Sequence, residues 1–244
     1  MAKIYFEILI FAIVALFLFS PQTYPLAKRL FDFLTSLTVF FISLILFVPI
    51  IIILRFSGEG EVFYFQKRVG FKNKQFYIWK FATMLKDSPN IGTGTITVRN
   101  DPRVTKFGKY LRKSKINELP QIINVMKGDM SLVGPRPLDN HAFKAYTPAI
   151  QKVVYSSRPG MTGIGSIFFR DEETIIHESN LSPRECYKQV IAPYKGELEK
   201  WYNRRKSFIT DIVLIVLTIF VIIFPRLDLA SIIIRDLPKF EKKS

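Results

Sequence analysis

An uncharged apolar run of 22 residues, from Phe33 to Leu54, constrains this chain more than any other part of its sequence. A helix of that length rises about 33 Å, which is close to the hydrocarbon thickness of a bilayer. Pro49 stands inside the run, where a proline removes one backbone hydrogen bond and bends a helix. The run therefore predicts a membrane helix that either crosses the bilayer or bends and returns to the face from which it entered.

The charges on either side of this run favour the second alternative. Lys28 and Arg29 precede the run, and a basic polar region begins at Arg55. A helix that crossed fully would place these charges on opposite faces, whereas basic segments tend to stay on the cytoplasmic side. We therefore expect a re-entrant helix that is kinked at Pro49, with the polar region on the cytoplasmic face.

Two further apolar runs flank the polar region. Ile4 to Phe19 predicts a short transmembrane helix, since no small-residue cleavage site of a signal peptide follows it. Phe208 to Phe224, which ends at Pro225, predicts a helix that either spans the membrane or lies along its interface. The expected organisation is an N-terminal hydrophobic segment (residues 1–24), a re-entrant membrane helix (25–57), a cytoplasmic domain (58–207), a C-terminal membrane-associated helix (208–225) and a basic tail (226–244).

The polar region predicts a compact, helix-rich α/β domain on this membrane anchor. Glu61 to Phe65 and Phe76 to Trp79 have the character of short strands. Apolar residues recur near helical spacing from Leu111 to Lys127, where Pro120 would suit the first turn of a helix. The Gly- and Thr-rich stretch from Asp87 to Asn100 predicts a loop.

A formal net charge of +15 indicates an anionic partner. Polybasic segments beside membrane helices bind anionic lipid head groups, so we expect membrane lipids and a phosphorylated substrate and no nucleic acid. Cys186 is the only cysteine and the chain has two histidines, which excludes an internal disulfide and argues against a zinc site. A metal held by carboxylates and phosphates would be magnesium.

The positive charge is concentrated between Gln66 and Arg136. This stretch has fifteen basic residues and four acidic ones, an excess of eleven positive charges. Arginine offers bidentate contacts to phosphate and lysine offers a point charge. We expect a cleft that holds a pyrophosphate, although simple attraction to the membrane surface would account for any single lysine.

Several short motifs run in a set order through this region. The central ones are Arg112-Lys-Ser-Lys-Ile-Asn-Glu-Leu-Pro-Gln121 and Asn124-Val-Met-Lys-Gly-Asp-Met-Ser-Leu-Val-Gly-Pro-Arg-Pro137. The flanking ones are Gln66-Lys-Arg-Val-Gly70, Lys80-Phe-Ala-Thr-Met84, Asp101-Pro-Arg-Val-Thr-Lys-Phe-Gly108 and Arg158-Pro-Gly-Met-Thr-Gly163. From about Lys28 to Phe224, their order and spacing resemble the bacterial sugar transferase family, the monotopic polyprenyl-phosphate phosphoglycosyl transferases.

The resemblance implies an enzyme of the bacterial inner membrane whose domain faces the cytoplasm. It implies transfer of a sugar-1-phosphate from a UDP-sugar to undecaprenyl phosphate with release of UMP, as the first membrane step of a glycan pathway. It also implies Mg²⁺, a re-entrant helix bent at Pro49 and a C-terminal helix along the interface. In this chain Val48 stands where the family commonly has serine before that proline. The sugar, the glycan pathway and self-association of the chain stay open.

The family's catalytic pair is Asp-Glu, and its aspartate attacks phosphorus to form a covalent intermediate. Here Asn117 stands at the aspartate position, and only Glu118 of the pair is a carboxylate. Three explanations compete: an inactive relative or engineered variant, attack or direct transfer involving Glu118, or a carboxylate elsewhere. Candidates for the last lie in the acidic run from Asp171 to Glu173, and this hypothesis predicts that Asp171→Ala or Glu172→Ala abolishes turnover.

The candidate site residues follow from the resemblance, apart from Asp171, which is a candidate because this chain lacks the family's aspartate. Glu118, Asn117 and Asp171 are the catalytic candidates, and Glu118 and Asp101 are the metal candidates. Substrate and phosphate contacts are expected from Lys80, Arg112, Arg136 and Arg158. A catalytically impaired membrane scaffold of polysaccharide assembly is the main alternative, with Asn117 as its support. A basic module that merely binds lipid or nucleic acid would not need these motifs at set spacing.

Overall fold

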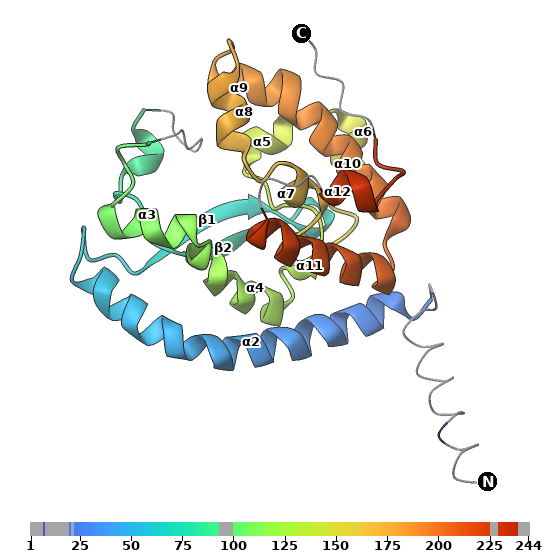
Figure 1. Cartoon of the computed structure of the whole chain (residues 1–244), viewed down its shortest axis with the longest axis horizontal. Coiled ribbons are helices and arrows are strands. Elements are labelled where there is room, and N and C mark those ends of the chain that lie inside the picture. The colour runs from blue at the N-terminus through green and yellow to red at the C-terminus, as the bar shows by residue number, and fades with distance from the viewer. Residues whose placement is uncertain (1–6, 8–19, 21, 93–99, 225–228, 239–244) are drawn as a thin grey trace.

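The protein is described here from a computed structural model, which covers residues 7, 20, 22–92, 100–224 and 229–238. A long helix, α2 (Tyr24–Arg55), underlies a helix-rich domain that contains two small sheets (Figure 1). The expectation of a helix-rich α/β domain on an apolar helix is confirmed. The expected first membrane helix (4–19, apart from residue 7), half of the loop at 87–100 and both ends of the basic tail (226–228 and 239–244) fall outside the described residues.

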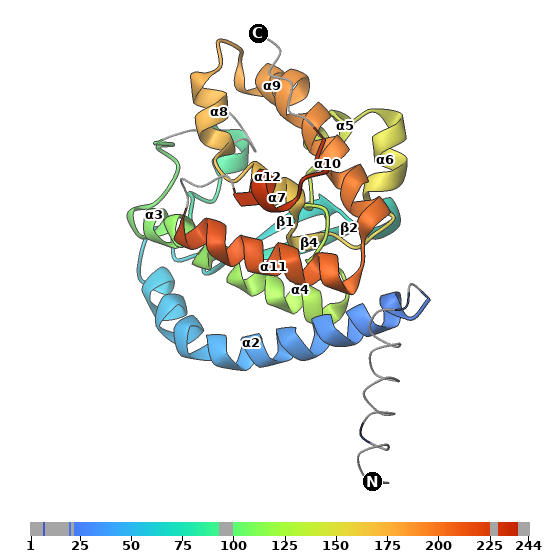
Figure 2. The same cartoon turned by 45° about the vertical axis from the view of Figure 1, so that its right-hand side comes forward.

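Helix α2 is the one described helix that is long and apolar enough to cross a membrane. It continues through Pro49, and the figures show it bowed, with both of its ends turned towards the domain (Figures 1 and 2). Apolar side chains on its outer side, among them Phe41, Ile42 and Ile45, are exposed. The polar side chains of Asp32, Ser36 and Ser43 are instead buried.

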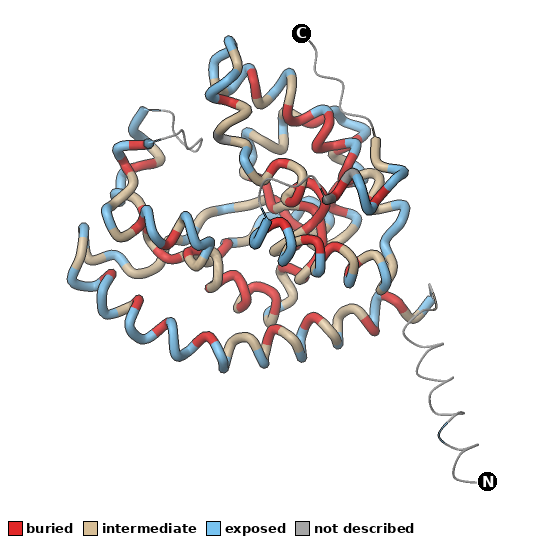
Figure 3. The backbone as a smooth tube through the Cα atoms, in the orientation of Figure 1, coloured by how far each residue is buried: buried red, intermediate tan, exposed pale blue. Residues whose placement is uncertain are grey.

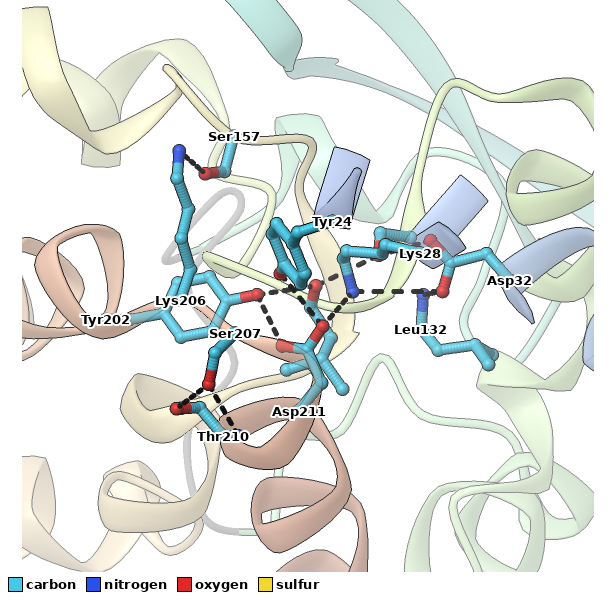
Figure 4. Close-up of polar contacts among 12 residues, drawn as sticks. Tyr24, Lys28, Asp32, Leu132, Ser157, Tyr202, Lys206, Ser207, Thr210 and Asp211 are labelled. Carbon is cyan, nitrogen blue, oxygen red and sulfur yellow. Dashed lines mark hydrogen bonds and ion pairs between the residues drawn. The ribbon is translucent and has the colours of Figure 1, made fainter. Parts of the chain in front are cut away.

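Polar contacts hold the first half of α2 to the domain. Lys28 Nζ lies 2.7 Å from Oδ2 of Asp211, which also accepts a hydrogen bond from the Tyr24 hydroxyl at 2.9 Å (Figure 4). The Asp211 carboxylate takes a third bond, from the Tyr202 hydroxyl at 2.8 Å. One helical turn on, Asp32 accepts hydrogen bonds from Ser131 Oγ and the Leu132 backbone N–H.

Apolar contacts hold the other end of α2 to the same domain. Phe47, Ile50 and Leu54 pack in one cluster with Phe81 and Leu111. The Phe47 and Phe81 rings lie edge to face with 5.1 Å between their centroids. Both ends of α2 therefore contact the same folded domain.

The two expected strands form a hairpin. Strand β1 (Phe63–Val69) pairs antiparallel with β2 (Gln75–Phe81), with Phe63 opposite Phe81 and Val69 opposite Gln75. The turn between them places Lys72 and Asn73 in the left-handed region, at φ of 54° and 58°. The hairpin fixes the position of Lys80, which lies near the end of β2.

The sequence predicts a single helix from Leu111 to Lys127, and this prediction is wrong because the chain forms three separate helical segments there. Helix α3 (Lys106–Lys113) ends, and Lys115 turns into the left-handed region at φ 60°. A 3₁₀ helix, η3 (Ile116–Gln121), follows and contains Pro120, and α4 (Ile122–Lys127) then begins. Pro120 has no N–H to donate, which suits the start of a new helix better than the interior of a long one.

The second sheet pairs β3 (Ser131–Val133) with β4 (Gly160–Thr162) in parallel. Its two backbones approach closely just after β3, since a Cβ on Gly134 would lie 2.2 Å from the Arg158 carbonyl oxygen. This explains the glycines of the two turn motifs at 134 and 160. Val133 of β3 belongs to the largest buried cluster, which also contains residues of α10 (Ala192–Arg205) and α11 (Phe208–Ile223). Figure 3 shows buried residues in the middle of the domain and exposed residues along its outer side.

The C-terminal apolar run forms α11, as expected from the sequence. Leu214 and Leu217 are buried in the domain core, whereas Ile209, Ile219 and Ile223 are exposed. The remaining elements are η1 (Phe71–Asn73), η2 (Ser88–Asn90), α5 (Asn140–Lys144), α6 (Pro148–Val154), α7 (Ile164–Phe168), α8 (Glu172–Glu178), α9 (Pro183–Cys186), the π-helix η4 (Tyr187–Ile191) and α12 (Leu229–Ile233).

Candidate active site

A cavity of about 1280 Å³ opens between the β1–β2 hairpin, η3, the turn after β3 and the helices α7 to α10. Twelve of its lining residues are basic: Arg68, Lys80, Lys86, Arg112, Lys113, Lys115, Arg136, Lys144, Arg170, Arg184, Lys188 and Lys195. Five are acidic: Glu61, Glu118, Asp139, Asp171 and Glu172. The excess of seven positive charges makes the cavity a site for an anionic ligand.

Glu118 lies at the centre of the basic part of this cavity. Its Oε1 atom is 2.9 Å from Lys80 Nζ and 3.7 Å from Arg136 Nη2. Burial by itself would raise the pKa of Glu118, but Lys80 and Arg136 outweigh it and lower the pKa below its ordinary value. Glu118 is therefore an ionised carboxylate at neutral pH.

The pKa of Lys80 is also shifted in this environment. Burial lowers its pKa to about 8, although the neighbouring Glu118 opposes the change. Asn124 holds strand β2, which carries Lys80. The side-chain amide of Asn124 accepts a hydrogen bond from the Trp79 N–H at 3.0 Å and donates one to the Tyr77 carbonyl at 2.8 Å. This pair of bonds joins α4 to β2 and places Lys80 against the 3₁₀ helix that carries Glu118.

The turn after β3 aims Arg136 at Glu118. The Tyr155 hydroxyl donates to the Arg136 carbonyl at 2.8 Å and accepts from the Leu138 N–H at 2.8 Å. Arg68 Nη1 donates to the Pro137 carbonyl at 3.3 Å. These three bonds hold the Gly-Pro-Arg-Pro turn from two sides, so the turn presents Arg136 rather than leaving it on a loose loop.

Asn117 lines the same cavity with only 6% of its surface exposed. Its side-chain oxygen is buried and has no hydrogen-bond partner among the described residues. Mg²⁺ prefers oxygen ligands, keeps several waters and needs only one or two protein oxygens when substrate phosphates complete its shell. The oxygens of Asn117 and Glu118 fit that requirement. Among the described residues, no group of three or more His, Cys, Asp or Glu gathers to cage a metal alone.

The structure brings most of the sequence-predicted residues together. Lys80, Arg112, Asn117, Glu118, Arg136 and Asp171 all line the cavity. Asp101 and Arg158 are not among its lining residues.

Those two residues have structural contacts instead. Asp101 is buried and pairs with Arg103 at 2.5 Å. Arg158 donates from Nε to the Gly128 carbonyl at 2.8 Å and lies 5.0 Å above the Phe71 ring.

Sequence reasoning missed the charged residues of α10. Lys195 is buried and pairs with Glu172 at 2.6 Å, and Glu199 is buried one helical turn further on. Burial raises the pKa of Glu199 to about 7, although Lys195 lowers it. A usable signal exists, since positions 192, 195, 199 and 202 form one buried stripe of a helix and two of the four are charged.

Comparisons with known proteins show the family to which this chain belongs. The family model described as "Bacterial sugar transferase" matches residues 23–225. The exopolysaccharide production protein ExoY of Rhizobium meliloti is 36% identical over 162 residues, which cover 60% of this chain and 71% of the relative. The undecaprenyl-phosphate glucose phosphotransferase of Komagataeibacter xylinus is 34% identical over 209 residues, which cover 82% of this chain.

A third relative has a more specific name. The UDP-N-acetylgalactosamine-undecaprenyl-phosphate N-acetylgalactosaminephosphotransferase of Aeromonas hydrophila is 37% identical over 152 residues, which cover 60% of this chain. The match spans about a third of the length of this relative and of the K. xylinus protein (35% and 36%). The extent of the family match over residues 23–225 establishes that this chain belongs to the bacterial sugar transferase family.

Proposed function

We propose that this protein transfers a sugar-1-phosphate from a UDP-sugar to undecaprenyl phosphate and releases UMP. The observation that carries the proposal is Glu118 held between Lys80 and Arg136 in a cavity with an excess of seven positive charges. Such a site suits a diphosphate that must meet a second anion. The names of the relatives from K. xylinus and A. hydrophila, both undecaprenyl-phosphate sugar phosphotransferases, support the acceptor.

Asp171 is the best source of the attacking carboxylate that position 117 lacks. Four of the five acidic residues of the cavity are ion-paired: Glu61 with Lys86, Glu118 with Lys80, Asp139 with Arg68 and Glu172 with Lys195. Asp171 is exposed and makes no ion pair among the described residues. Its side chain accepts one long hydrogen bond, from the Thr174 N–H at 3.3 Å, which caps the start of α8. A carboxylate whose charge no basic side chain offsets is the better nucleophile, and aspartate can form a covalent intermediate with phosphorus.

The proposed reaction has two steps. A carboxylate oxygen of Asp171 attacks the β-phosphorus of the UDP-sugar, the bond from that phosphorus to the bridging oxygen breaks, and UMP leaves. A phosphate oxygen of undecaprenyl phosphate then attacks the same phosphorus and frees Asp171. Lys80, Arg112 and Arg136 hold the phosphates and offset their mutual repulsion. Asn117 and Glu118 would hold Mg²⁺, which when bound neutralises charge on the diphosphate.

The same proposal places α2 in one leaflet of the membrane. Lys28 at one end and Phe47 near the other both contact the single folded domain. A helix that crossed a bilayer would carry its ends about 30 Å apart on opposite sides, where one domain could not reach both. The exposed apolar side of α2 would dip into the leaflet below the domain, and its basic flanks favour the cytoplasmic face of the inner membrane.

A reconstituted assay tests the function. The purified protein in lipid nanodiscs, with Mg²⁺, undecaprenyl phosphate and a panel of UDP-sugars, should release UMP and form a lipid-linked sugar diphosphate. Glu118→Gln should abolish both products, whereas Glu61→Gln, which changes an exposed acid at the edge of the same cavity, should leave them nearly unchanged. If no donor in the panel yields UMP from the wild-type protein, the proposal fails.

A further inference from the structure

One wall of the cavity carries polar side chains that the proposed reaction does not use. Ser166, Arg170, Glu172, Tyr187 and Lys195 line the cavity there, and Glu199 lies directly behind them beside Gly165. We call this set of six residues the α7–α10 wall. Its residues are distinct from the basic residues that surround Glu118 in the same cavity.

Five buried side-chain atoms of the α7–α10 wall have no hydrogen-bond partner among the described residues. Two are the carboxylate oxygens of Glu199, and the other three belong to residues that line the cavity. The Ser166 hydroxyl, the Tyr187 hydroxyl and Nη1 of Arg170 are buried, and none has a hydrogen-bond partner among the described residues. Leaving a buried polar atom unpaired costs about 1–3 kcal/mol, so proteins rarely do so without a ligand or water to complete the bond. Three such atoms on one side of a cavity point to a ligand with several hydrogen-bonding groups.

The charges of this wall are balanced. Lys195, only 2% exposed, pairs with Glu172 at 2.6 Å and lies 5.6 Å above the Tyr187 ring. Arg170 and Lys195 are largely offset by Glu172 and by Glu199, although burial raises the pKa of Glu199 to about 7. The wall around Glu118 has instead Lys80, Arg112 and Arg136 against one carboxylate. A neutral wall rich in donors and acceptors suits a polyhydroxylated neutral ligand, whereas the basic wall suits phosphate.

The two walls adjoin at the point where the proposed chemistry takes place. Arg136 Nη2 lies 3.7 Å from Glu118 Oε1, and the negative charges of Glu118 and Glu172 both raise the pKa of Arg136. Asp171, the proposed nucleophile, directly precedes Glu172 in the chain. In a nucleotide sugar the sugar is bonded to the β-phosphate, so it must lie next to the attacked phosphorus.

We infer that the α7–α10 wall is the subsite that recognises the sugar of the donor, with the hydroxyls of Ser166 and Tyr187 and the Glu172–Lys195 pair binding the hydroxyl groups of a neutral hexose. This inference rests on the proposed function, because it takes a nucleotide sugar as the ligand. It assigns donor selectivity to residues of α7, α8, η4 and α10 rather than to the Glu118 region.

Calorimetric binding to the full chain in nanodiscs tests this subsite. The ligands are UDP-glucose, UDP-galactose, UDP-N-acetylglucosamine and UDP without a sugar. Ser166→Ala and Tyr187→Phe each remove one oxygen without changing the shape of the side chain. Each should raise the Kd of the best-bound UDP-sugar by about five- to tenfold, the effect of one lost hydrogen bond. The Kd of UDP should stay within about twofold, which also reports that the variant is folded.

Tyr77→Phe serves as the matched control, since Tyr77 is exposed on β2 and does not line the cavity; it should change neither Kd. Equal weakening of UDP and UDP-sugar in the two variants would assign the wall to the nucleotide and overturn the inference. Unchanged binding of both ligands, or a wild-type protein that binds UDP-sugar no more tightly than UDP, would also overturn it. A protein that shows the predicted selectivity but releases no UMP would refute the transfer reaction and leave the subsite standing.

Discussion

Lys80 Nζ lies 2.9 Å from Oε1 of Glu118, and this contact joins the end of a β-hairpin to a 3₁₀ helix that begins 35 residues later. Both groups are charged at neutral pH, because burial lowers the pKa of Lys80 only to about 8 and the pKa of Glu118 lies below its ordinary value. Arg136 completes the group at 3.7 Å from the same oxygen. Raising the pH can therefore remove the positive charge that Lys80 places beside the phosphate site.

Activity should depend on the proton of Lys80. As the pH rises through about 8, the Lys80 ammonium loses its proton and the phosphate site loses one positive charge. We expect kcat/KM for the UDP-sugar to fall above pH 8, because this ratio reports ionisations of the free enzyme. Arginine stays protonated over this range, so Lys80→Arg should lose the inflection between pH 7 and 9. An unchanged inflection in that variant would assign it to another group.

Asp171→Ala should abolish turnover if Asp171 attacks phosphorus. The sharper measurement is UMP release in the absence of undecaprenyl phosphate, which a covalent intermediate permits once per enzyme molecule. We expect this single turnover in the wild-type protein and in Glu61→Gln, and none in Asp171→Ala. Glu172→Ala should also lose turnover, because it leaves the buried Lys195 without its partner. Full activity in both Asp171→Ala and Glu172→Ala would refute a role for the acidic run.

Asn117→Asp should restore UMP release to the Asp171→Ala variant. The substitution puts a carboxylate next to Glu118, at the position where the family places its nucleophile, and the neighbouring Lys80 and Arg136 would keep it ionised. Intact-protein mass spectrometry should then detect a sugar phosphate on the double variant. Asn117→Gln in the same background retains an amide and is the control. If the double variant stays inactive and carries no adduct, position 117 is not within reach of the phosphorus.

Asp211→Asn should loosen α2 from the domain. The Asp211 carboxylate is 2% exposed and takes contacts from Tyr24, Lys28 and Tyr202, so its loss leaves Lys28 with only its 3.9 Å contact to Asp32. We expect the free energy of unfolding to fall by about 3 kcal/mol, measured by denaturant titration in detergent. Glu197→Gln breaks the exposed Lys200–Glu197 pair and should change stability by less than about 1 kcal/mol. Equal effects of the two substitutions would show that the buried contacts do not hold α2.

Much of the fold and part of the site could be predicted from the sequence. The apolar helix at the N-terminal side, the two strands of the hairpin and α11 follow from runs and spacings that lie within one element. The coupled motifs gave the family and placed Lys80, Glu118 and Arg136 in one cavity. Local patterns suffice for these features because hydrophobicity and periodicity act between neighbouring residues.

The rest depends on contacts between distant parts of the chain. Lys28 meets Asp211 across 183 positions and Phe47 packs on Phe81, and such long-range contacts show that both ends of α2 face one domain. Asp101 and Arg158 share motifs with the site, yet their contacts with Arg103 and Gly128 hold them elsewhere. The chain itself determined an apolar anchor, a basic cavity and an amide at position 117. Tertiary packing decided which acids are ion-paired and left Asp171 without such a partner among the described residues, because charge pairing depends on distances that no sequence spacing fixes.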